Sequence, residues 1–181
     1  MKGEFDNRLS ATRDYAAGVY DPQHGFVITG GSDGYDALST AERTYDGVTF
    51  EAFPEMPGKM GGHCLVSLKN GNLLSTGELS TFLFNGSNNS WTTAASMPSY
   101  KSGKRLKETL HMIITTYMLM QFILGMSCGT IERDGLVSHI IAAGGKSSNQ
   151  RGRDYVNTAF IYNVEEDIWT TGLTSLITKG N

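Results

Sequence analysis

The chain has 181 residues, of which 39% are hydrophobic and 18% are charged, and its formal net charge is −3. This composition is ordinary for a globular protein with a buried core. The charge gives no electrostatic basis for binding nucleic acid or an anionic membrane, so neither is expected as a partner. Glycine is abundant at 22 residues and proline is scarce at 4, which favours tight turns between short strands over disorder.

Residues 1–57 form the first of three similar units. After a polar lead-in over residues 1–13, short apolar runs predict four strands, at residues 15–20, 26–29, 41–45 and 50–53. The second of these strands ends in Gly30-Gly31, and Asp46-Gly47 predicts a hairpin between the third and fourth.

Residues 58–98 and 128–181 repeat this order of strands and turns. The second unit has predicted strands at residues 63–68, 72–76, 81–84 and 91–93. The third has them at residues 128–131, 137–143, 158–162 and 169–171, with a long polar loop at 146–154. Met-Pro closes both early units, and Pro57 and Pro98 set a period of about 41 residues, which is in the range of propeller blades.

Residues 99–127 interrupt the repeat. Apolar side chains in this stretch are spaced like one face of a helix, at Leu106, Leu110, Ile113, Tyr117, Met120 and Leu124. The stretch is interpreted as a helical insertion between blades, or as non-coding sequence retained in frame in the gene model. A membrane-spanning helix is the least favoured interpretation, because residues 111–126 are shorter than the ~20 residues that a bilayer requires.

The repeated units resemble the kelch repeat, in which an apolar strand ends in Gly-Gly, a Tyr lies on the next strand, and a Trp begins the last strand before Met-Pro. The matching residues are Gly30-Gly31, Tyr45, Phe50 and Met56-Pro57, then Gly77-Glu78, Phe84, Trp91 and Met97-Pro98, then Gly144-Gly145, Tyr162 and Trp169. The resemblance implies an all-β fold, a partial kelch-type β-propeller of three four-stranded antiparallel blades with a helical insertion between blades 2 and 3. The glycines and aromatics would then be architecture rather than a ligand site.

Three blades are too few to close a ring, because propellers have four to eight. The chain is therefore expected to be a fragment, a truncated gene model or one part of a larger assembly. Its terminal sheets would each expose an apolar face, so poor solubility is expected.

Candidate catalytic or metal residues are not evident. The four histidines have no metal-type spacing, and the glycine-rich stretch at residues 30–34 has no lysine of the kind found in phosphate loops. No cofactor, metal or catalytic residue is predicted. Cys64 and Cys128 are taken to occupy equivalent places on the first strands of neighbouring blades. That placement predicts a separation too large for a disulfide, and hence two buried thiols.

The compartment is left open between two alternatives. Residues 1–10 are polar and carry no secretory signal, which slightly favours the cytoplasm. Secretion is the alternative if the true N-terminus is missing. The triplets Asn85-Gly86-Ser87 and Asn88-Asn89-Ser90 match the glycosylation pattern, but they are interpreted first as turn residues.

The function predicted from this resemblance is a non-enzymatic module that binds a protein partner through its blade loops. The candidate binding residues follow the glycine pairs of the first and third units: Asp33, Tyr35, Asp36, Arg151, Arg153, Asp154 and Tyr155. Tyrosine and arginine are favoured at binding hot spots. One alternative is a fragment of a kelch-type sugar oxidase or epimerase whose active site lies on other blades. Another is a secreted, glycosylated kelch protein.

Overall fold

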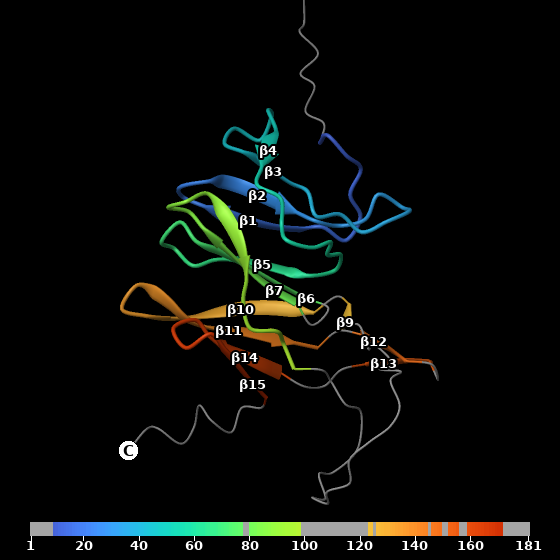
Figure 1. The fold of residues 1–181 in the computed structure, drawn as a ribbon, viewed down its shortest axis with the longest axis vertical. Coiled ribbons are helices and arrows are strands. Elements are labelled where there is room, and N and C mark those ends of the chain that lie inside the picture. Colours follow the sequence, from blue (N-terminus) through green and yellow to red (C-terminus); the bar gives the residue numbers. More distant parts are fainter. Residues whose placement is uncertain are drawn as a thin grey trace, which may run out of the picture.

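The computed structural model describes residues 9–77, 80–98, 123–124, 126–144, 146–149, 152–155 and 159–171. Within these ranges the chain is all-β: it contains fifteen strands and no helix (Figure 1). Three of its sheets have four strands each, and a fourth sheet has three.

The three four-stranded sheets have their strands in chain order, and each strand is antiparallel to its neighbours. The strands predicted from the sequence are confirmed, with their ends moved by one or two residues. The first sheet consists of β1 (Ala17–Asp21), β2 (Gly25–Thr29), β3 (Ala41–Thr44) and β4 (Glu51–Phe53). The second consists of β5 (Cys64–Ser67), β6 (Leu73–Gly77), β7 (Ser80–Asn85) and β8 (Ser90–Thr93). The third consists of β10 (Ser127–Arg133), β11 (Leu136–Ala143), β14 (Ala159–Asn163) and β15 (Ile168–Thr171).

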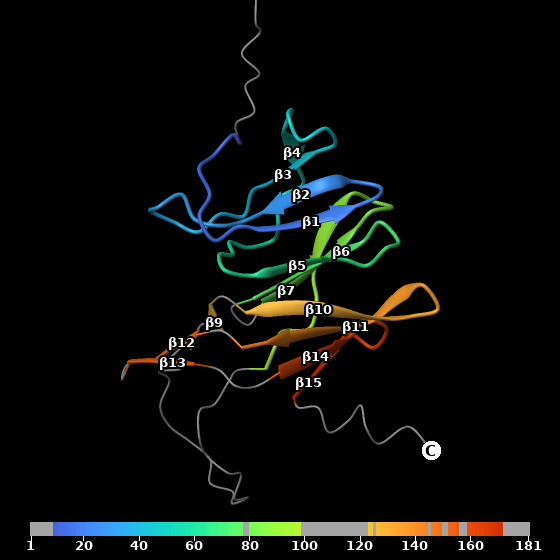
Figure 2. The same ribbon diagram turned by 180° about the vertical axis from the view of Figure 1, so that it is seen from behind.

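The sheets are stacked face to face in chain order, as Figures 1 and 2 show from opposite sides. Their first strands are neighbours: β1 contacts β5, and β5 contacts β10. We call the face of a sheet that looks toward the preceding sheet its leading face, and the opposite face its trailing face. The leading face of the first sheet is the one turned away from the second sheet.

Alternation along the strands decides which side chains enter the two interfaces between the sheets. Val27 on the trailing face of the first sheet shares an apolar cluster with Leu73 and Phe84 on the leading face of the second. Leu74 on the trailing face of the second sheet shares another with Ile140 and Tyr162 on the leading face of the third.

The tryptophans repeat the same local contacts in the second and third sheets. The ring of Trp91 lies 5.3 Å from that of Phe84, and Trp169 lies 5.1 Å from Tyr162. The indole N–H of Trp91 donates to the Pro54 carbonyl at 2.9 Å, and that of Trp169 donates to the Ala95 carbonyl at 3.0 Å. Each carbonyl belongs to the connection that enters the sheet, so the indole fixes that connection as well as filling the core.

The first sheet departs from the pattern that the sequence suggested. Phe84 pairs with Leu73 and Tyr162 pairs with Ile140, and each partner precedes the strand-ending glycine by four positions. The equivalent residue in the first sheet is Phe26, which pairs with Thr44. Assigning Tyr45 to this position was therefore wrong by one residue, and Tyr45 is 63% exposed.

The strand-ending glycines serve two different needs. Gly30 and Gly31 have φ of 59° and 92°, and Gly144 has φ of 74°, so these positions need the left-handed region as predicted. Gly77 does not. It is required for space, because a Cβ there would lie 2.7 Å from Cβ of His63.

The polar stretch after the third glycine pair is a hairpin and not the predicted loop. Here β12 (Lys146–Asn149) pairs with both β13 (Gly152–Tyr155) and β9 (Ile123–Leu124), forming the three-stranded sheet. The sequence shows no alternation here, so only long-range pairing reveals the strands. Most of the predicted helical insertion, residues 99–122 and 125, lies outside the described residues. Its end is wrong as helix, because Ile123–Leu124 is a strand and Ser127 begins β10.

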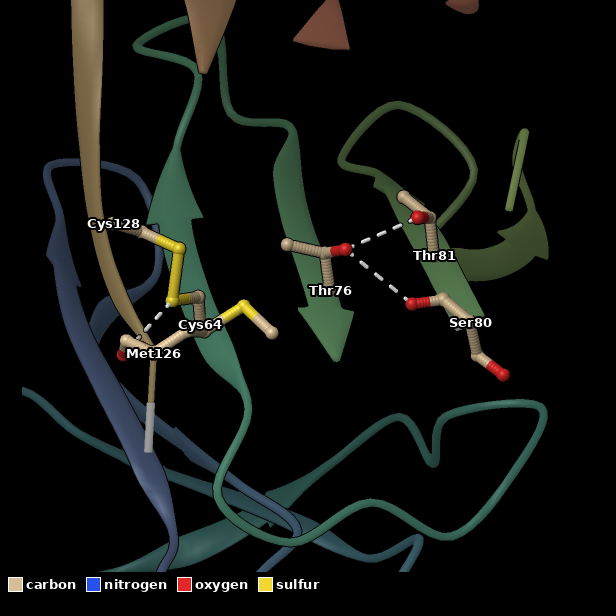
Figure 3. Close-up of a disulfide and its surroundings, with 6 residues drawn as sticks. All are labelled: Cys64, Thr76, Ser80, Thr81, Met126 and Cys128. Atoms are coloured by element: carbon tan, nitrogen blue, oxygen red, sulfur yellow. Dashed lines mark hydrogen bonds between the residues drawn. A yellow bond between two sulfur atoms is a disulfide. The ribbon is translucent and has the colours of Figure 1, made fainter. Parts of the chain in front are cut away.

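A disulfide joins Cys64 on β5 to Cys128 on β10, with a Cα–Cα distance of 6.1 Å (Figure 3). The prediction of two separate thiols was therefore wrong. The carbonyl oxygen of Met126 lies 3.7 Å from Sγ of Cys64, which is a contact without a hydrogen bond because a disulfide sulfur carries no hydrogen.

The error came from treating the two cysteines as equivalent. Cys64 pairs with Thr76, directly before Gly77, whereas Cys128 pairs with Ala142, two residues before Gly144. Because successive strand residues point to opposite faces, this offset of one residue turns Cys64 toward the third sheet and Cys128 toward the second. The two first strands are also neighbours, which brings the sulfurs together.

Candidate binding face

Several connections gather on one side of the stack. They are the β2–β3 connection (residues 30–40), the β4–β5 connection (residues 54–63) and the β12–β13 hairpin, which we together call the loop face (Figures 1 and 2). The β1–β2, β5–β6 and β10–β11 hairpins lie on the opposite side. The two predicted groups of binding residues therefore belong to segments on the same side of the molecule.

Asp33 organises the tip of the β2–β3 connection. Its carboxylate accepts the backbone N–H of Tyr35 at 2.9 Å and that of Asp36 at 2.8 Å. These two hydrogen bonds lower the pKa of Asp33, with the bond from Asp36 contributing most. The turn is thus fixed locally by an aspartate side chain, as is common where Asp begins a turn.

Backbone hydrogen bonds join the base of this connection to the next one. The N–H of Gly31 donates to the Met60 carbonyl at 2.8 Å, and the N–H of Met60 donates to the Leu38 carbonyl at 3.0 Å. The first two segments of the loop face are therefore tied together as one surface.

An ion pair links the same two segments at the surface. Lys59 Nζ donates to Asp36 at 2.5 Å, and both side chains are exposed. The hydrogen bond and charge of Lys59 lower the pKa of Asp36. Exposed pairs of this kind contribute little stability, because water screens them, so this pair mainly sets the position of charge next to the tyrosine.

Tyr35 is the most exposed large side chain of the described residues, at 99%. An aromatic ring held on an ordered turn loses little conformational freedom when it is covered, which makes it a suitable anchor for a partner. The three predicted residues of the first loop are thus one exposed group: an aromatic ring between two carboxylates, one of them paired with lysine.

The other predicted residues lie on the hairpin that replaces the predicted loop. Arg153, Asp154 and Tyr155 are on β13, where they pair with Ser148, Ser147 and Lys146 of β12. Because β12 is the central strand of its sheet, β13 is an edge strand. Arg151 lies outside the described residues.

A buried histidine beneath the loop face was not identified as unusual from the sequence. The Nε2 atom of His63 lies 2.8 Å from Oγ1 of Thr29, across the first two sheets, and its Nδ1 atom has no partner among the described residues. Burial lowers the pKa of His63 to about 4. The ring is neutral near pH 7 and packs against Gly30 and Gly77.

A second feature missed by the sequence reasoning is a buried ion pair. Arg13 donates to Glu42 at 2.8 Å, to the carbonyls of Gly30 and Thr40, and to Thr40 Oγ1. The two side chains are only 1% and 5% exposed. Burial raises the pKa of Glu42, but hydrogen bonds from Ser10 and Arg13 outweigh it, so the pKa is lowered overall. Residue spacing gives no signal for this contact, which joins positions 29 residues apart.

No model of a known protein family matches the chain, and no curated protein matches it either. The described ranges contain no group of three or more His, Cys, Asp or Glu side chains that could hold a metal ion. In the same ranges, no helix is long and apolar enough to cross a membrane.

Proposed function

We propose that the three stacked sheets are consecutive blades of a kelch-type β-propeller and that the chain is a protein-binding module. The sequence repeats support the kelch assignment. The shared strand order, the neighbouring first strands and the repeated tryptophan contacts are the arrangement that such blades require.

The observation that carries the binding proposal is the loop face. The connections that differ most between the repeats lie on one side of the stack, and the first of them holds Tyr35 almost fully exposed on an ordered turn. Rigid scaffolds commonly place binding residues on loops of this kind. We therefore assign partner binding to the β2–β3 connection and the β12–β13 hairpin.

Site-specific photocrosslinking tests this assignment. A photoreactive amino acid is placed at position 35 and, as a matched control, at the exposed position Ser87 in the β7–β8 turn. We expect one discrete protein adduct from position 35, lost when unlabelled wild-type chain competes, and none from position 87. Equal labelling from both positions would contradict a binding role for the loop face.

The disulfide favours the secreted kelch protein over a cytoplasmic one. Disulfides persist in oxidising compartments and are rare in the cytosol. Asn85 and Asn88, the acceptor positions of the two triplets, lie in the β7–β8 turn, and Asn88 is exposed. We expect a chain directed into the secretory pathway to gain mass at Asn88 that a glycosidase removes. An unmodified, fully reduced chain in that pathway would argue for the cytoplasm.

A further inference from the structure

The leading face of the first sheet exposes aromatic side chains where the other sheets are buried. Phe26 is 42% exposed, whereas its equivalents Leu73 and Ile140 are fully buried against the preceding sheet. Tyr20, which pairs with Phe26, is 67% exposed. The equivalents of Tyr20 are much smaller: Ser67 pairs with Leu73, and Thr130 pairs with Ile140.

The outer half of this face is already covered. Glu42 occupies the position that Phe82 and Phe160 hold in the other sheets, as the strand register shows. It is buried under Ser10 and Arg13. The open part of the leading face is therefore confined to β1 and β2, the inner half, where neighbouring sheets of this molecule approach most closely.

The trailing face of the third sheet has the complementary form. Gly129 pairs with Ile141, as Val19 pairs with Val27 and Val66 with Leu74 in the other sheets. Both valines pack into the apolar clusters between the sheets. A Cβ added at Gly129 would meet no heavy atom of the described residues within 4 Å.

This trailing face is also covered on its outer half, since Ile161 on β14 is only 3% exposed. Ile131 and Ile141 on the inner strands are half-buried, and Gly129 is exposed. The two terminal faces of the stack are therefore open over the same inner strands and closed over the outer ones.

The side-chain sizes on these two faces compensate each other. Each internal interface combines a valine on the trailing strand with a small residue on the leading strand: Val19 with Ser67, and Val66 with Thr130. The terminal faces combine a glycine, Gly129, with a large residue, Tyr20. A gap on one face and a protruding ring on the other would fill the space that a valine and a serine fill between the first and second sheets.

We propose that two copies of this chain associate head to tail, with the leading face of the first sheet of each copy packed on the trailing face of the third sheet of the other. The proposal rests on the propeller arrangement given above. Whole copies add blades in threes, and six is the only multiple of three between four and eight. Two copies therefore close one ring, and the association stops at a dimer instead of continuing as a filament.

Mass measurement of the 181-residue chain tests the association directly. Light scattering after size exclusion should give twice the monomer mass of 19.7 kDa. Tyr20→Asp, which places a charge in the interface, should shift the dissociation constant by at least about tenfold. Tyr35→Asp, at an exposed tyrosine on the loop face, should leave the dimer unchanged. A chain that stays monomeric, or a ladder of larger species, would overturn the closed dimer.

A size exchange separates packing in the interface from general misfolding. Gly129→Val and Tyr20→Ser should each weaken the dimer, because the first fills the gap and the second leaves it empty. The double variant should recover much of the wild-type affinity, since it recreates the valine–serine combination of the first internal interface. Additive losses in the double variant would contradict the proposed contact. A monomer that still crosslinks a partner through position 35 would overturn the dimer and leave the binding module standing.

Discussion

At the scale of single residues, His63 connects burial to pH. It lies between the first and second sheets with one ring nitrogen near Thr29 and the other without a partner among the described residues. Protonation would place an uncompensated charge in this interface, which is why burial holds its pKa at about 4. The unfolded chain, whose histidines titrate near 6.5, binds the proton more tightly.

The free energy of unfolding should therefore fall as the pH drops from about 6.5 toward 4, because the unfolded state takes up the proton first. The difference between the two pKa values corresponds to about 3 kcal/mol. Urea unfolding at several pH values measures this dependence. His63→Asn, which cannot titrate, should be less stable at pH 7 and should lose less on acidification. Equal pH slopes for both proteins would show that His63 does not cause the effect.

Gly77 gives a second prediction at this scale. A Cβ at this position would lie 2.7 Å from Cβ and 3.0 Å from Cα of His63, so the strand or the histidine must move. Gly77→Ala should lower the free energy of unfolding by about 1–3 kcal/mol. Gly61→Ala is the matched control, because its nearest neighbour would be at an ordinary 3.6 Å. Similar losses in both variants would remove the packing explanation.

At the scale of elements, the segment before β1 is fastened to the first sheet by Arg13. Removing this arginine leaves Glu42 buried without a charged partner, which typically costs about 3–5 kcal/mol. Arg13→Met should therefore destabilise strongly in chemical denaturation. Arg13→Met/Glu42→Met should be less destabilised than the single variant, because no charge is left in the site. A double variant as unstable as the sum of the two single variants would contradict this account.

The strands were predictable because their signals are local. Apolar runs bounded by glycine, asparagine and proline place all twelve strands of the three main sheets within two residues. The β12–β13 hairpin was missed because its polar residues pair with β9, about 22 residues earlier in the chain. The tyrosine of the first unit was misplaced because the aromatic residue lies one position beyond the true equivalent, Thr44, and local pattern alone does not fix register.

The candidate site was predictable to a similar degree. The variable length of the connection after the second strand identified Asp33, Tyr35 and Asp36, and the structure finds them on one ordered, exposed turn. The pairing of Asp36 with Lys59 and the burial of His63 depend on how successive sheets stack, which no local pattern reports. The disulfide was missed for the same reason of register.

At the scale of the whole molecule, the disulfide is the covalent link between the second and third sheets. It closes a chain segment of 64 residues, which by loop entropy stabilises the folded state by about 4 kcal/mol. Cys64→Ala/Cys128→Ala should lower the midpoint of urea unfolding. Reduction of the wild-type chain should lower it by a comparable amount, and should not affect the double variant further. A reductant effect that persists in the double variant would have another cause.

The same bond decides what a cut in the chain does. Cys64 and Cys128 enclose the basic residues Lys101, Lys104, Arg105 and Lys107. A protease that cleaves after any of them produces two fragments that remain joined through sulfur. The nicked protein keeps its third sheet attached to the second, and the cleavage is visible on a gel only after reduction. Hydrolysis in this region therefore removes the continuity of the backbone without dividing the molecule.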